Sequence, residues 1–191
     1  MTRPDEVLFG RAEIERAFTA LGERLARRGV VADVFVVGGA AMALAYDAAR
    51  VTRDIDAVFK PHGIVLEEAR NVADDLGLPP WWLNEQASVY ISGKEDASKR
   101  RVFDHPGLRV MAASPTHVFA MKARAARTRD IDDLRLLADI IGLNSAEEAL
   151  QICAEFYPDE PVSARSTAVL LELFGSAGTA RYAGNGPAGT S

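Results

Sequence analysis

The stretch of this chain that most constrains its fold is residues 34–59, which read VFVVGGAAMALAYDAARVTRDIDAVF. A short valine-rich run ends at Gly38-Gly39, and a second short run begins at Asp54. The segment between them is rich in alanine, which is the strongest helix former. The sequence therefore predicts a strand, a helix and a second strand in close succession, over residues 33–37, 40–49 and 54–59.

The rest of the first half of the chain continues this alternation. Apolar residues recur at helical spacing over 11–28 and 64–77, which predicts two amphipathic helices. Residues 87–93 and 108–113 are typical of further strands. The charged residues 94–107 between them predict a loop or a long hairpin tip.

The pattern changes near residue 114, after which we expect only helices. Ser114 is a candidate N-cap with a proline at the first helical position. Ser145, followed three residues later by Glu148, fits a capping box. The expected helices cover residues 114–129, 130–142, 145–157 and 161–175.

This order of elements predicts an α/β (α+β) fold. A core with a mixed sheet is expected over residues 1–113, followed by a helical bundle over residues 114–175. Residues 176–191 are rich in glycine, alanine and serine, which predicts a disordered tail.

Composition excludes several classes of protein. Cys153 is the single cysteine of 191 residues, so no intrachain disulfide and no cysteine-based metal site is expected. No apolar run approaches the length of a membrane span, and the N-terminal sequence has no signal-peptide pattern, so we expect a cytoplasmic protein without membrane contact. The net charge of −5 is unusual for a dedicated nucleic-acid binder, although basic groups lie at 99–101 and 122–129.

Gly38 and Gly39 lie between an expected strand and an expected helix. The first amides of a helix lack internal partners and favour an anion, and glycine lets a phosphate approach the backbone. A nucleotide phosphate site is one interpretation of the pair. The other is that the glycines only form a tight turn.

Asp54 and Asp56 share one face of the second strand, because residues two apart in a strand point to the same side. Ile55, Ala57 and Phe59 form the opposite, apolar face, which should pack on the core. Two neighbouring carboxylates repel each other unless a cation lies between them. Hard oxygen ligands suit Mg²⁺, which often takes its other ligands from substrate phosphates. The alternative is a pair of solvated acids at a strand end.

The run GGAAMALAYDAARVTRDID resembles the signature of the polymerase-β-like nucleotidyltransferase superfamily. In that superfamily, a Gly-Gly or Gly-Ser pair precedes Asp-x-Asp on the next strand. The spacing of Arg50, Thr52, Asp54 and Asp56 is similar to that of the AbiEii and MenT branch of toxin nucleotidyltransferases. The resemblance continues to Lys122 on a later helix and to an R-D-x-x-D-L segment beginning at Arg129, and it covers about residues 33–141.

The resemblance implies Mg²⁺-dependent transfer of a nucleoside monophosphate from an NTP to an acceptor hydroxyl. Asp54 and Asp56 would hold the metal, and Gly38, Gly39, Arg53 and Lys122 would bind the nucleotide. The toxin branch further implies the 3′ end of tRNA as acceptor and an antitoxin as protein partner. The third carboxylate would come from Asp130 or Asp133, or from the loop acid Asp104, because the expected later strands contain no acid.

The helical wheel bears on these last residues. Lys122 emerges from a largely apolar helix face, where it either reaches a triphosphate or extends along the surface. Asp130 and Asp133 fall near the inner face of the next helix, whereas Asp132 points away. The alternative for Asp130 and Asp133 is a capping role at the helix start. Similarly, Trp81-Trp82 offers either a surface for base stacking or an anchor for a loop.

Two other functions remain open on the sequence alone. In the first, the chain transfers the nucleotide to a small molecule or a protein, and the acidic net charge favours this function. In the other, the chain is a nucleotide-binding or regulatory protein without turnover, which the missing acid on the later strands favours.

Overall fold

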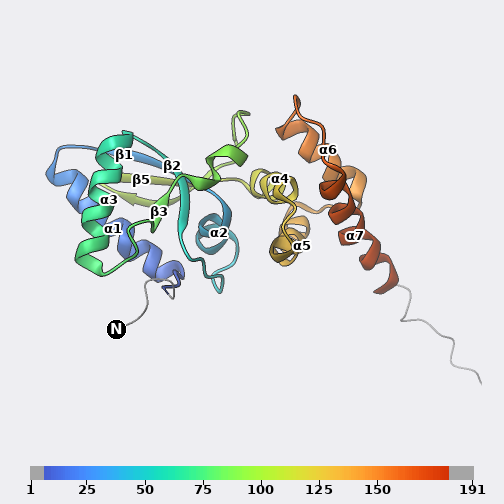
Figure 1. Ribbon diagram of the computed structural model, residues 1–191, viewed down its shortest axis with the longest axis horizontal. Coiled ribbons are helices and arrows are strands. Elements are labelled where there is room, and N and C mark those ends of the chain that lie inside the picture. The colour runs from blue at the N-terminus through green and yellow to red at the C-terminus, as the bar shows by residue number, and fades with distance from the viewer. Residues whose placement is uncertain (1–6, 181–191) are drawn as a thin grey trace, which may run out of the picture. The chain divides into compact units, whose positions relative to one another are not determined.

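The computed structural model describes residues 7–180, with side chains for residues 7–175 (Figure 1). The described chain divides into two compact units. Unit 1 combines residues up to Ile91 with Glu95–Val118, and unit 2 combines Ser92–Lys94 with the residues from Phe119 onward.

Unit 1 is built on a five-stranded mixed sheet with the order β3-β2-β1-β5-β4. Strand β1 pairs antiparallel with β2 and parallel with β5, while β3 is parallel to β2 and β4 is antiparallel to β5. The mixed sheet, together with the helices, confirms the expected α+β fold class. The strands are β1 (Ala32–Val36), β2 (Ile55–Lys60), β3 (Leu83–Asn84), β4 (Arg100–His105) and β5 (Leu108–Ala112).

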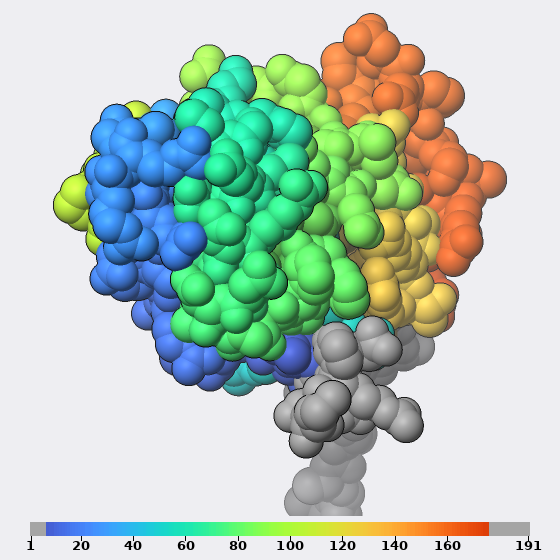
Figure 2. All heavy atoms as spheres, turned by 60° about the vertical axis from the view of Figure 1, so that its left-hand side comes forward, coloured from blue at the N-terminus to red at the C-terminus, as the bar shows by residue number. Residues whose placement is uncertain are grey.

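One face of this sheet forms the core of unit 1. Alternate residues of β1, β2 and β5 are buried, as period-2 patterning requires. Helices α1 (Arg11–Arg27) and α3 (His62–Leu76) lie side by side against the sheet (Figures 1 and 2). Phe18 of α1 and the fully buried Trp82 are 6.2 Å apart between ring centroids. The Trp82 indole donates a hydrogen bond to the carbonyl of Ala69, which fixes the chain that leads into β3.

An ionic network joins α1 to α3. Arg24 of α1 and Arg28, the C-cap residue of that helix, each donate a hydrogen bond of 2.8 Å to the buried carboxylate of Glu68 on α3. Burial alone would raise the pKa of Glu68, but the hydrogen bonds from Arg28, Asn71 and Arg24 outweigh it and lower that pKa to about 2. The ionised carboxylate of Glu68 therefore contributes to the contact between α1 and α3.

The segment expected as one helix over residues 40–49 consists of two shorter pieces. Helix α2 (Gly38–Ala41) begins at the glycine pair and continues as a π-helical turn, η2 (Met42–Tyr46). The residues from Ala40 to Leu44 are buried, and the Tyr46 hydroxyl donates to the carbonyl of Ala113. Burial, together with this bond, holds the short helix against the sheet.

The expectation of a strand over residues 87–93 is wrong. Residues Gln86–Tyr90 form a 3₁₀ helix, η3, and Val89 is 70% exposed, so its alternating apolar residues do not mark a buried face. The neighbour of β2 is instead β3, a strand of two residues. The expected loop over residues 94–107 contains β4, which forms a hairpin with β5.

Unit 2 is helical. Helix α4 (Pro115–Ala125) crosses the boundary between the units, and Ser114 caps it by accepting a hydrogen bond from the amide of His117. Ser145 caps α6 by accepting from the amide of Glu148, whose side chain accepts from Asn144 instead of from Ser145. The other helices are η4 (Thr128–Asp130), α5 (Ile131–Ile141), α6 (Ala146–Phe156) and α7 (Ala164–Ala180).

Helix α7 extends past the boundary expected for the C-terminal tail. Residues 176–180, which the sequence places in a disordered tail, continue this helix. Leu170 and Leu173 are buried and tie the preceding turns to unit 2. Residues 181–191 of the expected tail lie outside the described residues.

No helix among the described residues combines the length and the apolar character that a bilayer crossing requires.

The Glu68 network gives a prediction about stability. Because the pKa of Glu68 is lowered, its contribution is present above the unfolded pKa near 4.5 and is lost as the pH falls toward 2. Glu68→Gln should lower the free energy of unfolding by roughly 2 kcal/mol at pH 7. Urea unfolding at pH 7 and pH 2.5 should show this difference shrinking at low pH.

The exposed neighbour Glu67 provides a matched control, because its side chain is 61% exposed and pairs with Arg28 at the surface. Glu67→Gln should change the free energy of unfolding by less than about 0.5 kcal/mol. An equal loss for Glu68→Gln at both pH values would contradict the ionic origin of its contribution.

Candidate functional site

The turn after β1 lies directly beside the second aspartate of β2. The amide of Val37 donates a hydrogen bond of 3.0 Å to the carbonyl of Asp56. Gly38 follows with a φ of +58°, in the left-handed region that favours glycine. A Cβ built on Gly38 would lie 3.6 Å from Oδ2 of Asp56, so this carboxylate faces the turn. The glycine pair and the Asp-x-Asp pair therefore meet at one place in unit 1.

Gly39 is required for a different reason. A Cβ at this position would lie 2.6 Å from Oγ1 and 3.0 Å from Cβ of Thr52, so only glycine fits without a shift. The Thr52 hydroxyl in turn donates a 2.9 Å hydrogen bond to the carbonyl of Asp54. Thr52 thus links the start of α2 to the chain that enters β2. Thr52 belongs to the sequence motif, but no spacing in the sequence indicates its contact with Gly39.

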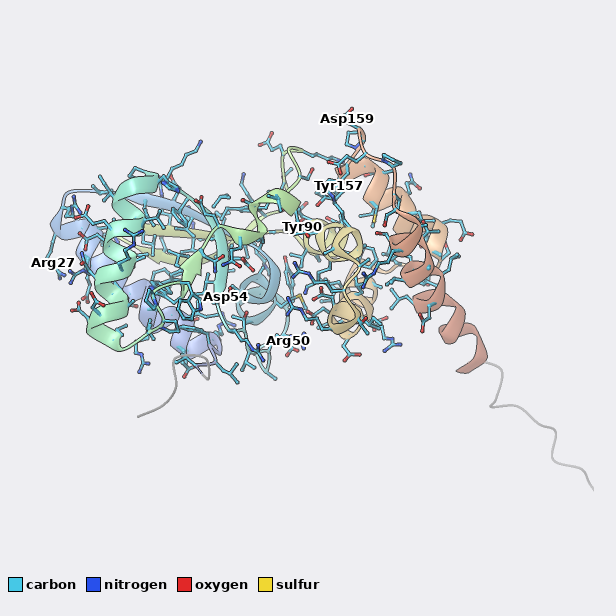
Figure 3. The ribbon with its side chains drawn as sticks, viewed as in Figure 1. Arg27, Arg50, Asp54, Tyr90, Tyr157 and Asp159 are labelled. Carbon is cyan, nitrogen blue, oxygen red and sulfur yellow. The ribbon has the colours of Figure 1, made fainter. Side chains whose placement is uncertain are left out.

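Asp54 and Asp56 present their carboxylates on the side of β2 that is not packed on the core. Both residues are half-buried, whereas Ile55 and Ala57 between and beyond them are buried, so the expected alternation is confirmed. Asp54 lies immediately before β2, and Arg50 lies in the loop that follows η2 (Figure 3). Asn84, the last residue of β3, donates a hydrogen bond to Asp54, and Ala87, which follows β3, donates one to Asp56.

The donor set fits a magnesium ion that also binds substrate phosphates. Mg²⁺ is commonly held by one or two carboxylates and completes its octahedral coordination with water and phosphate oxygens. Throughout residues 7–175, no three His, Cys, Asp or Glu side chains gather around one metal position. Asp54 and Asp56 could therefore supply two protein ligands, with Oδ2 of Asp56 on the side that faces the Gly38 turn.

Asp104 is not the third carboxylate. It lies on β4, which is separated from β2 by β1 and β5 in the sheet. Three strand spacings amount to roughly 14 Å. Its side chain is half exposed and pairs with Arg101.

Lys122, Asp130 and Asp133 come together in unit 2. The Lys122 ammonium lies 2.7 Å from Oδ1 of Asp130 and 2.7 Å from Oδ2 of Asp133. All three residues are buried, and Asp132 is exposed, which agrees with the faces expected from the helical wheel. We call these three residues the Lys122 cluster. In this arrangement both carboxylates compensate the charge of Lys122, which was expected to face a triphosphate.

Asp130 occupies the N-cap position of α5, as the alternative interpretation expected. Its side chain makes no capping hydrogen bond there and accepts from Lys122 instead. Ala126, just after α4, has a φ of +47°. The chain turns at this residue, so that the segment carrying Asp130 and Asp133 comes back toward Lys122. A left-handed residue at this point ends the helix and reverses the chain direction.

The two tryptophans have different environments. Trp82 is fully buried and anchors its loop on the core, whereas Trp81 is 45% exposed. Only Trp81 therefore remains a candidate for base stacking. Arg53, expected to bind nucleotide, is exposed next to Asp54, and its role stays a prediction.

Unit 2 also contains a cavity of about 190 Å³, lined in part by Arg124, Cys153, Tyr157 and Glu160. Arg124 pairs with Glu160 at 2.5 Å and lies over the Tyr157 ring. Burial raises the pKa of the Cys153 thiol to about 11 and that of Tyr157 to about 12. Both groups are therefore protonated at neutral pH, and the cavity offers no activated nucleophile.

Among known families, the model of one described as "Nucleotidyltransferase of unknown function (DUF6036)" matches residues 14–156, which include Asp54, Asp56 and the Lys122 cluster. Neither a curated protein nor a solved structure matches the chain.

The two glycines give a prediction about stability. Gly38→Ala should lower the free energy of unfolding by about 1 kcal/mol, because alanine is strained at positive φ. Gly39→Ala should cost more, because Thr52 must move. Chemical denaturation measures both, with Gly63→Ala in α3 as the control, since nothing lies within 4 Å of its added Cβ. Wild-type stability of Gly39→Ala would contradict the close packing against Thr52.

The Lys122 cluster gives a second prediction. Lys122→Met leaves Asp130 and Asp133 buried without their shared cation, and it should lower the free energy of unfolding by about 3–5 kcal/mol. Arg135→Met, which removes an exposed pair with Asp132, should change it by less than about 0.5 kcal/mol. Lys122→Met with wild-type stability in urea unfolding would show that the cluster does not stabilise unit 2.

Proposed function

This chain belongs to the matched family of nucleotidyltransferases of unknown function, and from that premise we propose that it transfers a nucleoside monophosphate from an NTP to an acceptor hydroxyl, with release of pyrophosphate. The observation that carries the proposal is the position of Asp56. Its Oδ2 faces the Gly38 turn, and Asp54 lies two residues away on the same side of β2.

The geometry of unit 1 supports a role for these residues in binding the triphosphate. A carboxylate pair by itself repels a phosphate, so an anion at the Gly38 turn requires a cation between them. We propose that Asp54 and Asp56 hold Mg²⁺, which, when bound, neutralises the charge that develops on the phosphates. Gly38 and Gly39 let the triphosphate approach the backbone, and the exposed Arg53 contacts it from the loop.

The Lys122 cluster is assigned to the same reaction by its sequence motif. Lys122 would bind the triphosphate, and Asp130 and Asp133 would provide the further carboxylate. The buried pairing of Lys122 with both acids adds a condition, because a buried ion pair is separated only at a cost of several kcal/mol. In the proposed nucleotidyl transfer, Lys122 therefore acts together with Asp130 and Asp133 and not as an isolated cation.

The acceptor is proposed from the resemblance to the toxin branch. That resemblance favours the 3′ end of tRNA as acceptor, an antitoxin as partner and a place in a toxin–antitoxin system. The net charge of −5 favours a small molecule or a protein side chain instead. Incubation with labelled NTPs and tRNA, total protein or a panel of hydroxyl-bearing small molecules separates these acceptors.

A second candidate function is nucleotide binding without turnover. The observation in its favour is that the strand beside β2 carries Asn84, a neutral residue, as the partner of Asp56. Under this alternative the protein binds an NTP with Mg²⁺ and releases no pyrophosphate. Equilibrium binding combined with a pyrophosphate-release assay distinguishes it from the transferase.

The transferase proposal predicts the effect of removing one carboxylate. Asp56→Asn should lower the rate of label transfer by at least about a hundredfold, because one of two charged ligands is lost. Asp74→Asn removes an exposed carboxylate from α3 of the same unit and should leave the rate within twofold of wild type. Retention of the full rate by a folded Asp56→Asn protein would exclude the proposed role of Asp56.

A further inference from the structure

The end of β3 and the segment that follows it contact both carboxylates of the candidate site. The side-chain amide of Asn84 donates a 3.0 Å hydrogen bond to Oδ2 of Asp54. The backbone amide of Ala87 donates a 3.2 Å hydrogen bond to Oδ1 of Asp56. One oxygen of each acid is therefore held by neutral donors from residues 84–87.

The position of Asn84 follows from the strand register. Asn84 is the register partner of Asp56 on the parallel pair β2–β3. Register partners on neighbouring strands point to the same face of a sheet. Asn84 therefore stands on the face that carries Asp54 and Asp56, at the place where a third acid on the next strand would lie.

The orientation of the Asn84 amide is fixed by its neighbours. Its Oδ1 accepts a 2.9 Å hydrogen bond from the backbone amide of Gln86. Its Nδ2 faces the carbonyl of Trp81 at 3.2 Å and Oδ2 of Asp54, both of which only accept. If the amide were flipped, its oxygen would face two acceptors, the Trp81 carbonyl and Asp54, and its nitrogen would face the donor amide of Gln86. The direction of the hydrogen bond, from Asn84 to Asp54, is therefore defined by these neighbours.

We propose that Asn84 is a positioning residue for the metal ligand Asp54. By holding Oδ2, it directs the other oxygen of Asp54 toward the cation and keeps the carboxylate beside Asp56 without adding charge. Hydrogen-bond partners of ligating carboxylates commonly set metal affinity in this way. The inference rests on the proposed magnesium site, and it identifies Asn84 as a residue that the motif does not contain.

The test is metal affinity measured by calorimetric titration of the full chain with Mn²⁺. Asn84→Ala should weaken Mn²⁺ binding about tenfold, because Asp54 loses the bond that orients it. Asn71→Ala is the matched control, since it also removes an amide that donates to a carboxylate, Glu68, in α3. The control should bind Mn²⁺ within twofold of wild type.

A second variant keeps the test valid if Asn84→Ala does not fold. Asn84→Ser retains a side-chain oxygen that can accept from the amide of Gln86, but it removes the amide that donates to Asp54. It should weaken Mn²⁺ binding about tenfold, because Asp54 again loses the bond that orients it. Mn²⁺ binding by a folded Asn84→Ser protein within twofold of wild type would overturn the proposal.

The outcomes separate this inference from the proposed function. If wild-type protein binds no Mn²⁺, both proposals fail. If wild-type protein binds Mn²⁺ and Asn84→Ala binds it within twofold, only the role of Asn84 is overturned. Thermal unfolding of each metal-free variant identifies a purely structural role, which would lower the melting temperature and leave the affinity unchanged.

Discussion

The candidate site of unit 1 depends on one backbone hydrogen bond, from the amide of Val37 to the carbonyl of Asp56. It continues the antiparallel pairing of β1 with β2 by one residue past the end of β1. The turn that follows β1 is thereby fixed against the start of β2. A shift of this register by one residue would turn Asp56 to the buried face, where an acid cannot be accommodated without a partner. The same pairing thus determines both the packing of the core and the position of the carboxylates.

Much of this arrangement is readable from the sequence, because it depends on local patterns. The alternation around Asp54 and Asp56 and the helical wheel around Asp133 each identify the correct face of their element. The β3 strand is not readable, because two residues have no periodicity, and it is positioned by the distant anchor of Trp82 on Ala69. The apolar alternation near Val89 is misleading, because Val89 faces solvent and Tyr90 and Ile91 are only half-buried. Contacts between segments, such as Thr52 with Gly39, leave no trace in spacing alone.

The two groups of acids manage like-charge repulsion in different ways. In unit 2, Asp130 and Asp133 are buried and share the ammonium of Lys122, so their cation is built into the fold. In unit 1, Asp54 and Asp56 are half-buried and receive hydrogen bonds from the neutral donors Asn84 and Ala87. Neutral donors orient a carboxylate. Because Asp54 and Asp56 are only half-buried, they are accessible to a cation from solution, whereas the two acids of unit 2 are buried.

The contact between Gly39 and Thr52 has a consequence for reading other sequences. A search pattern that contains only the glycine pair and Asp-x-Asp accepts chains in which a large side chain stands two residues before the first aspartate. Such a side chain would collide with the start of α2, because even the threonine Cβ leaves no space for a methyl group on Gly39. A motif that also requires a small residue at that position excludes chance matches by side-chain size as well as by residue identity.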